Sequence, residues 1–437
     1  MKQPSDEFRA LLAEAMAHFR AGRLAEAERA YRTALAIVPE DSAVTHNLGV
    51  AIAGQGRHQA AIGCFDEALK HDPGFVAAHY NRAVALMRLG ETREAIKAFG
   101  RVAQLEPQHY EAHRALGFLW LAQGERGRAL DHFARTYELR RGDDRTTIAR
   151  KSLTTATRDK LEHDAEQFLY LSQRTRDRQR FELLARNYRT IAAELSDDVT
   201  ALSAAQIEVL GEDYNAPIHL RAAPEASGHA VNERADLATL TARFNAQGAI
   251  AVDDLLTPQA FYSLRRFLLE STIWHDFSHI AGFVASYLED GLACPLVLQI
   301  ADDLRRAFPE ILGGQPLSQA WAFKGLQAQA AVDVHADDAA VSVNFWVTPT
   351  EANLDPGHGG LVVCLSPPPE DWEIKDYDAD QERIVTFLKQ RAADSLIVPY
   401  RQNRAVLFRS RLFHHSDRPE FASGYENHRI NLTLLYG

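Results

Sequence analysis

The feature that most constrains this chain is an interval of 34 residues at which the same residue types recur through its first third. The recurring positions are Gly22, Gly56, Gly90 and Gly124; Ala27, Ala61, Ala95 and Ala129; and Pro39, Pro73 and Pro107. Glycine accepts the left-handed conformation that ends many helices, a small residue lets two helices approach closely, and proline stops a helix. Each interval therefore predicts a pair of helices, and such pairs bury their apolar faces by stacking into an array.

Aromatic residues follow the same register. They are Phe65, Phe99 and Phe133, with Tyr31 at the first equivalent position. With these residues in place, the segment 45–73, THNLGVAIAGQGRHQAAIGCFDEALKHDP, resembles the tetratricopeptide repeat (TPR). The resemblance implies an α-helical solenoid of TPR repeats over residues 1–143, with about four repeats and a concave groove that recruits a protein or peptide.

Two asparagines occupy equivalent positions in successive repeats, Asn47 and Asn81. In some proteins of this repeat family, asparagines so placed run along the groove and bind a peptide backbone. The resemblance thus makes Asn47 and Asn81 candidates for a peptide-binding groove. The alternative is that asparagine is simply frequent at this position of the repeat.

Residues 144–211 lose the 34-residue register but keep helical spacing. Their apolar stripes are Leu161, Ala165 and Phe168, and then Phe181, Leu184, Tyr188, Ile191 and Leu195. This spacing predicts a helical cap or spacer that follows the repeats. Residues 212–236 are rich in proline, alanine, glycine and charge, and we interpret them as a linker.

From residue 237 onward the pattern is that of a separate domain of mixed helices and strands. A helix capped by Thr257, with Pro258 at its first position, follows a short strand near its start. Later apolar runs predict strands at 319–327, 340–347, 359–365, 394–400, 404–410 and 428–437. Short strands separated by glycine and proline turns favour a jelly roll or related double sheet with flanking helices over residues 237–437.

Chemically active side chains gather in this predicted sheet. His335 and Asp337 are two positions apart, so an extended segment directs both to one face, and His414 and His415 follow much later in the chain. Two histidines and one carboxylate leave three positions of a metal open, which is the arrangement of non-haem iron(II) oxygenases. In the last strand Arg429 shares one polar face with Asn431 and Thr433, as expected for a strand that lines a site.

The three segments HADD, SRLFHHSD and HRINLTLLYG, in this order, are similar to iron(II)- and 2-oxoglutarate-dependent dioxygenases of the prolyl-hydroxylase-like and phytanoyl-hydroxylase-like type. The resemblance covers roughly residues 240–437 and implies a double-stranded β-helix. It implies that His335, Asp337 and His414 bind Fe(II), with His415 as the alternative to His414. It also implies that Arg429 binds the distal carboxylate of the cosubstrate 2-oxoglutarate, with O2 as the oxidant.

Asn344 shares a face of its strand with Ser342, and in the family this face lines the 2-oxoglutarate pocket. Asn344 is therefore a candidate for cosubstrate binding, and a hydrogen-bonding role in the core is its alternative. The acidic segment 366–382 is a candidate lid, and a solvated loop is the other interpretation.

These features together predict a hydroxylase that acts on a protein or peptide side chain recruited by the TPR domain. One alternative is an oxygenase acting on a small metabolite, with the repeats used for assembly. The other is a non-catalytic TPR scaffold.

Charge and composition bound the partners and the location. The net charge of -11 predicts no nucleic-acid partner, which would require a basic face. No apolar run reaches the length that spans a membrane, and the first residues lack a signal-peptide core, so no membrane partner is expected. The three cysteines have no CxxC spacing, and a cytoplasmic location is predicted.

Overall fold

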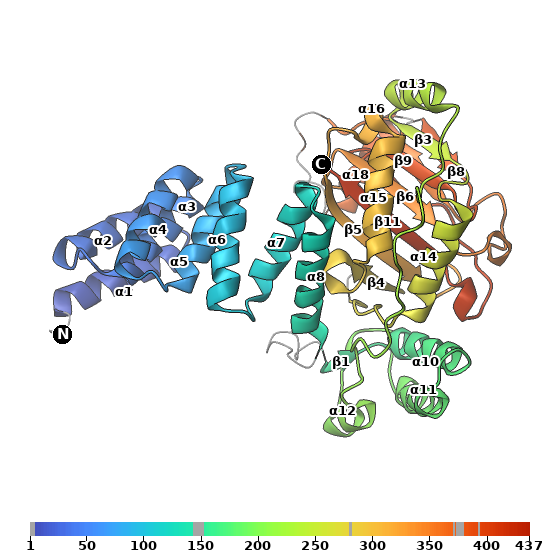
Figure 1. The fold of residues 1–437 in the computed structure, drawn as a ribbon, viewed down its shortest axis with the longest axis horizontal. Coiled ribbons are helices and arrows are strands. Elements are labelled where there is room, and N and C mark those ends of the chain that lie inside the picture. Colours follow the sequence, from blue (N-terminus) through green and yellow to red (C-terminus); the bar gives the residue numbers. More distant parts are fainter. Residues whose placement is uncertain (1–4, 143–152, 279–281, 370–371, 373–379, 392–393) are drawn as a thin grey trace. The chain divides into compact units, whose positions relative to one another are not determined.

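The computed structural model describes residues 5–142, 153–278, 282–369, 372, 380–391 and 394–437 (Figure 1). The chain divides into two compact units, residues 1–132 and 133–437. The division lies earlier than the predicted end of the repeat domain at residue 143. The reason is that the last helix of the array contributes side chains such as Tyr137 and Arg141 to the carboxyl-terminal unit, where they contact His275 and Asp290.

The amino-terminal unit is built from helical pairs, as the 34-residue interval predicts. Its helices are α1 (Asp6–Arg20), α2 (Leu24–Ile37), α3 (Ser42–Gly54), α4 (His58–His71), α5 (Val76–Arg88), α6 (Thr92–Leu105), α7 (Tyr110–Ala122) and the first part of α8 (Arg126–Arg141). The four recurring glycines have φ between 72° and 77°, the left-handed value that ends the first helix of each pair. The four recurring alanines are completely buried, so the two helices of each pair pack closely.

In the carboxyl-terminal unit, the segment from residue 153 to residue 211 forms a layer of helices. It contains α10 (Arg158–Ser172), α11 (Arg178–Ala192) and α12 (Ala204–Leu210), with a two-stranded sheet of β1 (Thr155–Ala156) and β2 (Thr200–Ala201). Both predicted apolar stripes are buried in one core. Residues 212–236, predicted to be a linker, have mostly irregular backbone that is hydrogen-bonded to the rest of the unit; Ala230 N donates to Asp303 Oδ2 at 2.7 Å.

Two antiparallel sheets form the centre of this unit. The six-stranded sheet has the order β3 (Ala249–Val252), β9 (Ala405–Arg409), β6 (Val341–Trp346), β11 (Ile430–Tyr436), β5 (Leu317–Gly325) and β4 (Phe283–Tyr287). The three-stranded sheet has the order β10 (His414–Ser416), β7 (Leu361–Cys364) and β8 (Ser395–Val398). Every predicted strand in the later half of the unit is present, whereas β4 and the three-residue β10 were not predicted.

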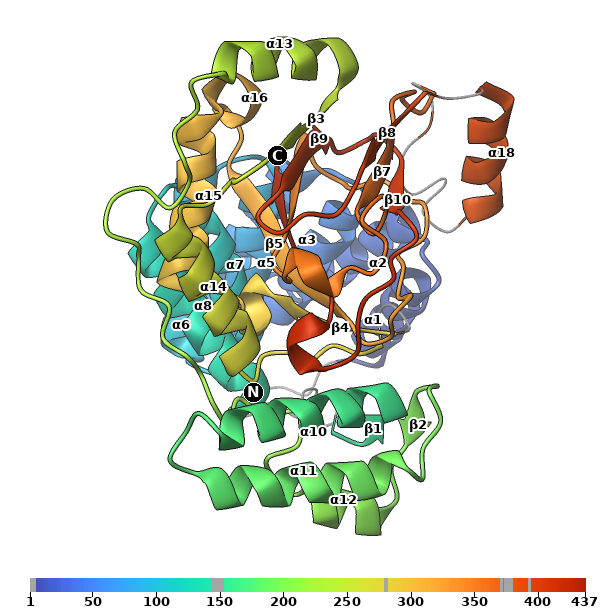
Figure 2. The same cartoon turned by 90° about the vertical axis from the view of Figure 1, so that its right-hand side faces the viewer.

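The two sheets face each other across an apolar core. Residues Ala249, Trp346, Val406 and Phe408 of the larger sheet pack there with Leu361, Val363 and Val398 of the smaller one. The opposite face of the larger sheet is covered by α14 (Pro258–Glu270) and α15 (Pro295–Ala307) (Figures 1 and 2). As predicted, α14 begins with Pro258, and the Thr257 side chain accepts a hydrogen bond from Ala260 N.

Shorter elements complete the unit. They are α13 (Leu237–Gln247), η1 (Leu288–Asp290), α16 (Pro309–Leu312), η2 (Thr350–Ala352), α18 (Gln381–Arg391) and η3 (Tyr425–Asn427). Among the helices described in either unit, none combines the length and the apolar composition needed to cross a membrane. The cysteines Cys64, Cys294 and Cys364 are free thiols.

Candidate metal centre

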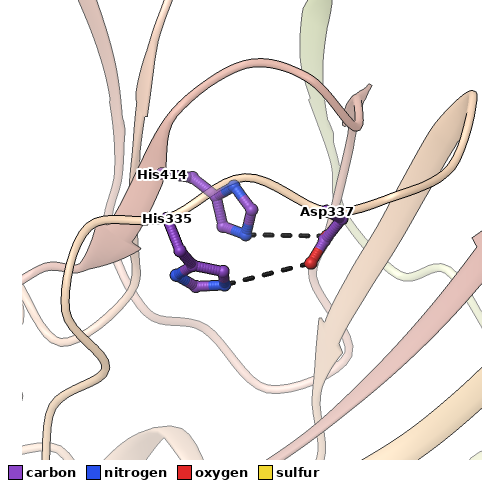
Figure 3. A group of neighbouring side chains, drawn as sticks. All are labelled: His335, Asp337 and His414. Carbon is purple, nitrogen blue, oxygen red and sulfur yellow. Dashed lines mark ion pairs between the residues drawn. The ribbon is translucent and has the colours of Figure 1, made fainter. Parts of the chain in front are cut away.

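The side chains of His335 and Asp337 converge with that of His414, which lies much later in the chain (Figure 3). Their nearest nitrogen and oxygen atoms all lie within 4.8 Å of one another. Asp337 is 3.9 Å from His335 Nε2 through Oδ1 and 3.6 Å from His414 Nε2 through Oδ2. In the described part of the chain this is the one group of three such residues with metal-ligand spacing.

Backbone pairing explains why these residues meet. His335 and His414 form an isolated antiparallel bridge in which each backbone N donates to the other's carbonyl, at 3.1 and 2.9 Å. The backbone N of Asp337 donates to Ser410 O at 2.9 Å, just before the same turn. The segment before β6 is thus attached to the segment leading into β10, and its alternation directs His335 and Asp337 toward His414.

Both imidazoles are held with the same tautomer. His335 Nδ1 lies 2.7 Å from Asp333 O, and His414 Nδ1 lies 3.0 Å from Leu412 O. Because a carbonyl only accepts, each Nδ1 carries the proton and each Nε2 offers its lone pair to the centre. Burial lowers the pKa of His414 to about 4, and the nearby His335 acts in the same direction, so His414 is neutral at pH 7 as a metal ligand must be.

The carboxylate of Asp337 is also oriented. Ser342 on β6 donates its hydroxyl to Asp337 Oδ2 at 2.6 Å, and Ser342 Oγ lies 2.8 Å from Ser410 Oγ. A hydrogen bond of this kind sets the angle of a ligand carboxylate and supports metal affinity.

Replacing Ser342 by alanine is therefore expected to weaken divalent-metal binding by about 10- to 100-fold, the usual effect of losing an outer partner of a ligand. The matched control is Ser410→Ala, which removes the neighbouring hydroxyl but leaves Ser342 able to donate to Asp337. Isothermal titration calorimetry with Fe(II) under anaerobic conditions measures the affinities of both variants. Equal losses in the two variants would contradict a specific role for Ser342.

A cavity lies directly beside the three residues. Its lining includes Asn344 of β6, Arg429, Asn431 and Thr433 on and before β11, Trp321 and Phe323 of β5, and Val332, Leu361, His415 and Ser416. Its volume of about 40 Å³, the space open to the centre of a water-sized sphere, exceeds the roughly 10–15 Å³ that one water molecule requires. The polar face of β11 predicted from the alternation of Arg429, Asn431 and Thr433 therefore lines this cavity, together with Asn344.

Arg429 is a buried cation without a counter-charge. Arg429 is only 5% exposed. Its one hydrogen bond in the described chain is donated by Nη2 to Gly360 O, at 3.1 Å. Nε has no partner, and no carboxylate of the described residues pairs with the guanidinium. Burial lowers the pKa of Arg429 to about 10, which still leaves it protonated at pH 7. An unpaired buried cation is costly, so an anion is the chemical complement of this end of the cavity.

The amides beside Arg429 are also only partly engaged. Asn344 Nδ2 donates to Thr433 Oγ1 at 3.0 Å, but Asn344 Oδ1 and Asn431 Oδ1 have no hydrogen-bond partner in the part of the chain that the structure describes. Buried polar atoms are normally satisfied, so three unsatisfied groups around one cavity indicate a polar ligand. Asn344 therefore lines the cavity, as a cosubstrate-binding residue would. It also makes a hydrogen bond within the sheet, as expected for the alternative in which it has a hydrogen-bonding role in the core.

The structure distinguishes the two adjacent histidines. His415 borders the cavity but is not one of the three converging residues, and its Nδ1 lies 2.8 Å from Ser416 O. Successive residues of β10 point to opposite sides, so only His414 joins His335 and Asp337. The acidic segment 366–382, the candidate lid, falls largely on residues 370–371 and 373–379, which lie outside the described residues.

In the amino-terminal unit, Asn47 and Asn81 are both half-buried and both contact His46. Asn81 Nδ2 lies 2.8 Å from His46 Nε2, and Asn47 Oδ1 lies 3.2 Å from His46 Nδ1. One imidazole therefore joins the two amides between α3 and α5. A peptide that binds these asparagines would have to use their remaining hydrogen-bonding capacity or displace His46.

Sequence reasoning did not single out Ser342, Ser410 or Trp321 as part of this site. Ser342 shares the face of Asn344, which is the signal that could have identified it. Ser410 and Trp321 carry no comparable signal, because their positions depend on the turn before β10 and on the pairing of β5 with β11.

Comparisons with known proteins concern the amino-terminal region. Tetratricopeptide-repeat models match residues 3–42, 12–74, 46–92 and 76–109. A comparison with curated protein sequences gives no significant match.

Several solved repeat proteins are similar over the helical part. The first TPR domain of Spaghetti (RPAP3) bound to an HSP90 peptide is 23% identical, covering 28% of this chain and 96% of that one with a TM-score of 0.27. MamA is 20% identical over 41% of this chain and 92% of its own, with a TM-score of 0.28. A tetratricopeptide repeat protein from Parabacteroides merdae is 21% identical over 44% and 73%, with a TM-score of 0.31.

Proposed function

We propose that this chain, whose amino-terminal region consists of tetratricopeptide repeats, carries an Fe(II)- and 2-oxoglutarate-dependent dioxygenase in its carboxyl-terminal unit and hydroxylates a protein or peptide side chain. The observation that carries the proposal is the pairing of two features in one cavity. A His–Asp–His group with metal-ligand spacing lies at one wall, and the unpaired guanidinium of Arg429 lies in the same lining. Two antiparallel sheets facing each other suit the double-stranded β-helix of that family.

His335, Asp337 and His414 would hold the iron. Two neutral imidazoles and one carboxylate are the donor set of non-haem iron(II) oxygenases, and they leave positions open for other ligands. Iron(II) bound there would supply the activation of O2, coupled to the oxidative decarboxylation of 2-oxoglutarate. The protein's own part is to fix the Nε2 lone pairs through Asp333 O and Leu412 O, and the carboxylate through Ser342.

Arg429 would anchor the cosubstrate. A guanidinium offers a rigid fork that matches a carboxylate, and Nε of Arg429 has no partner among the described residues. Asn344, Asn431 and Thr433 would flank the same carboxylate with amide and hydroxyl groups. The cosubstrate would neutralise the buried charge, for which the described residues supply no acidic partner.

The substrate is proposed to be a protein or peptide because the repeats build a recruiting surface. One of the similar TPR structures has an HSP90 peptide bound. By analogy, a peptide would lie along the face that carries Asn47 and Asn81. If deletion of the repeats left turnover of every protein substrate unchanged, an oxygenase acting on a small metabolite would be the better description.

Anaerobic titration with Fe(II) and 2-oxoglutarate tests the catalytic part of the proposal directly. A visible charge-transfer band that requires both components is expected from a chelated cosubstrate. Absence of the band, with the metal bound, would favour the non-catalytic TPR scaffold.

Arg429→Met sharpens the test through two opposite effects. Loss of a charge-assisted pair of hydrogen bonds, worth about 1.5–3 kcal/mol each, is expected to weaken 2-oxoglutarate binding by at least about 100-fold. Without ligand, the variant is expected to be about 1–3 kcal/mol more stable, because an unpaired buried cation has been removed. The control is Arg409→Met, at an exposed position of β9, which should change neither quantity. A variant that binds 2-oxoglutarate normally would contradict the assignment.

A further inference from the structure

We propose that the group oxidised at this centre is uncharged and apolar, an aliphatic or aromatic side chain that lies on an aromatic wall at the mouth of the cavity. The inference rests on the proposed dioxygenase function and adds the chemical class of its substrate. We define the aromatic wall as Phe283 and Tyr287 of β4, Trp321 and Phe323 of β5, and the neighbouring Ala330 and Val332.

The wall is one continuous surface because of strand register. Tyr287 is paired with Trp321, and Phe323 is paired with Ala285, so these side chains of β4 and β5 lie side by side on one face of the sheet. Trp321 and Phe323 line the cavity, and the β4 residues continue the same surface beyond it. The ring of Phe323 is 6.0 Å from that of Phe283 and 6.2 Å from that of Trp321, measured between centroids. Since β4 is the edge strand of the larger sheet, the wall extends from the cavity toward the edge of the sheet.

The two ends of the cavity differ in both polarity and exposure. Arg429 and Asn431 are each 5% exposed and form the closed, polar end. At the metal centre, the side chain of His335 is 34% exposed, whereas those of Asp337 and His414 are 6% exposed. The open side is therefore that of His335, which follows Val332 closely in the chain, and Trp321 and Val332 are themselves only half-buried.

Charge distribution decides the class of substrate. Among the described residues that line the cavity, the charged side chains apart from the histidines are Asp337 and Arg429, and the proposed function already uses both. The phenol of Tyr287 is engaged, because it donates to Asp276 Oδ2 at 3.2 Å. A charged substrate group on this wall would find no counter-charge in the lining, whereas an apolar group would be removed from water against aromatic rings.

The reaction balances without any further component. One atom of O2 enters the carbon–hydrogen bond of the apolar group as a hydroxyl, and the other enters the new carboxylate of succinate. 2-Oxoglutarate loses CO2 and supplies the two electrons that the hydroxylation requires beyond those of the substrate. O2 is reduced, and both the substrate and 2-oxoglutarate are oxidised.

The full-length protein with Fe(II) and 2-oxoglutarate tests the inference with blocked amino acids as probes. N-acetyl amides of leucine, phenylalanine and proline are compared with those of lysine and aspartate at one common concentration. Succinate formation and a mass gain of one oxygen in the probe are measured. The apolar probes are expected to raise succinate formation at least threefold above the rate without a probe, and the charged probes are not.

The variant Trp321→Lys provides a second test of the substrate class. A cation on the wall is expected to shift the preference toward the aspartate probe, and Tyr262→Lys, at a 62% exposed aromatic residue of α14, should leave the preference unchanged. Three results would overturn the inference, provided that the charge-transfer band forms. They are a wild-type preference for the lysine or aspartate probe, no response to any probe, and an unaltered preference in Trp321→Lys. If the band itself does not form, the proposed function fails first.

Discussion

Replacing His414 by alanine is expected to lower the affinity for Fe(II) by more than about 100-fold and to reduce 2-oxoglutarate decarboxylation to background. Loss of an outer partner of a ligand already costs about 10- to 100-fold, and loss of the ligand itself exceeds that. The imidazole of His414 is buried, neutral and held by Leu412 O with Nε2 directed at Asp337, so its loss removes one of the three converging donor atoms.

His415→Ala is the matched control for this prediction. The two histidines are adjacent, but His415 is not one of the converging residues. Its loss should leave Fe(II) affinity within about threefold of the wild type, since it removes neither a ligand nor an outer partner of one. Anaerobic calorimetric titration measures the affinities, and circular dichroism verifies the fold of each variant. If the two variants exchange these results, His415 is the ligand and the assignment of β10 is wrong.

The second large effect is expected on stability, at the carboxyl end of α8. Arg141 donates from Nε and Nη2 to the two oxygens of Asp290, at 2.8 and 2.7 Å, and the two side chains are 4% and 1% exposed. Replacing Arg141 by leucine leaves a buried carboxylate whose remaining ion-pair partner among the described residues is the more distant Arg140, at 3.7 Å. The free energy of unfolding of the carboxyl-terminal unit is therefore expected to fall by about 3–5 kcal/mol.

The pH dependence of this effect follows from the pKa of Asp290. Burial alone would raise that pKa, but the guanidinium of Arg141 outweighs burial and holds it below its usual value. A pKa that is lower in the folded protein contributes stability above the unfolded pKa of about 3.9, and the contribution disappears as the pH falls through the folded value. The difference between wild type and Arg141→Leu should thus be full at pH 7 and shrink below about pH 4.

Urea denaturation followed by tryptophan fluorescence measures this loss, because four of the five tryptophans lie after residue 133. Arg178→Ala, which removes an exposed helical ion pair with Glu182, is the control and should cost less than about 0.5 kcal/mol. The double variant Arg141→Leu with Asp290→Leu should recover most of the stability, since no unpaired charge remains. A single variant as stable as the wild type would show that this ion pair contributes little to the fold.

Local pattern was sufficient for the elements of this protein. The interval between Gly22, Gly56, Gly90 and Gly124 predicted the helical pairs, because glycine in the left-handed conformation ends a helix wherever the pair stacks. Alternation of polar and apolar residues predicted β6 and β11 and the polar face that carries Arg429. These signals are local in sequence, since each reports which side of one element is buried.

The site was predictable only as a set of candidates. Alternation directed His335 and Asp337 to one face, but His414 and His415 are adjacent and remained alternatives until the pairing of β10 with β7 fixed which one turns inward. The hydrogen bond from Ser342 to Asp337 and the lack of an acidic partner for Arg429 are likewise properties of packed neighbours. No periodicity records them, because the groups that meet come from separate strands.

By itself, then, the sequence determined the repeat array, most strands of the larger sheet and the residue types able to bind a metal. The tertiary structure alone decided which histidine joins the centre, where the two units divide within α8, and that an aromatic wall adjoins the open side of His335. The physical reason is the distance along the chain over which each kind of interaction acts. Turn chemistry and side-chain alternation act between neighbours in the chain, whereas convergence, burial and unpaired charge depend on how distant strands are packed together.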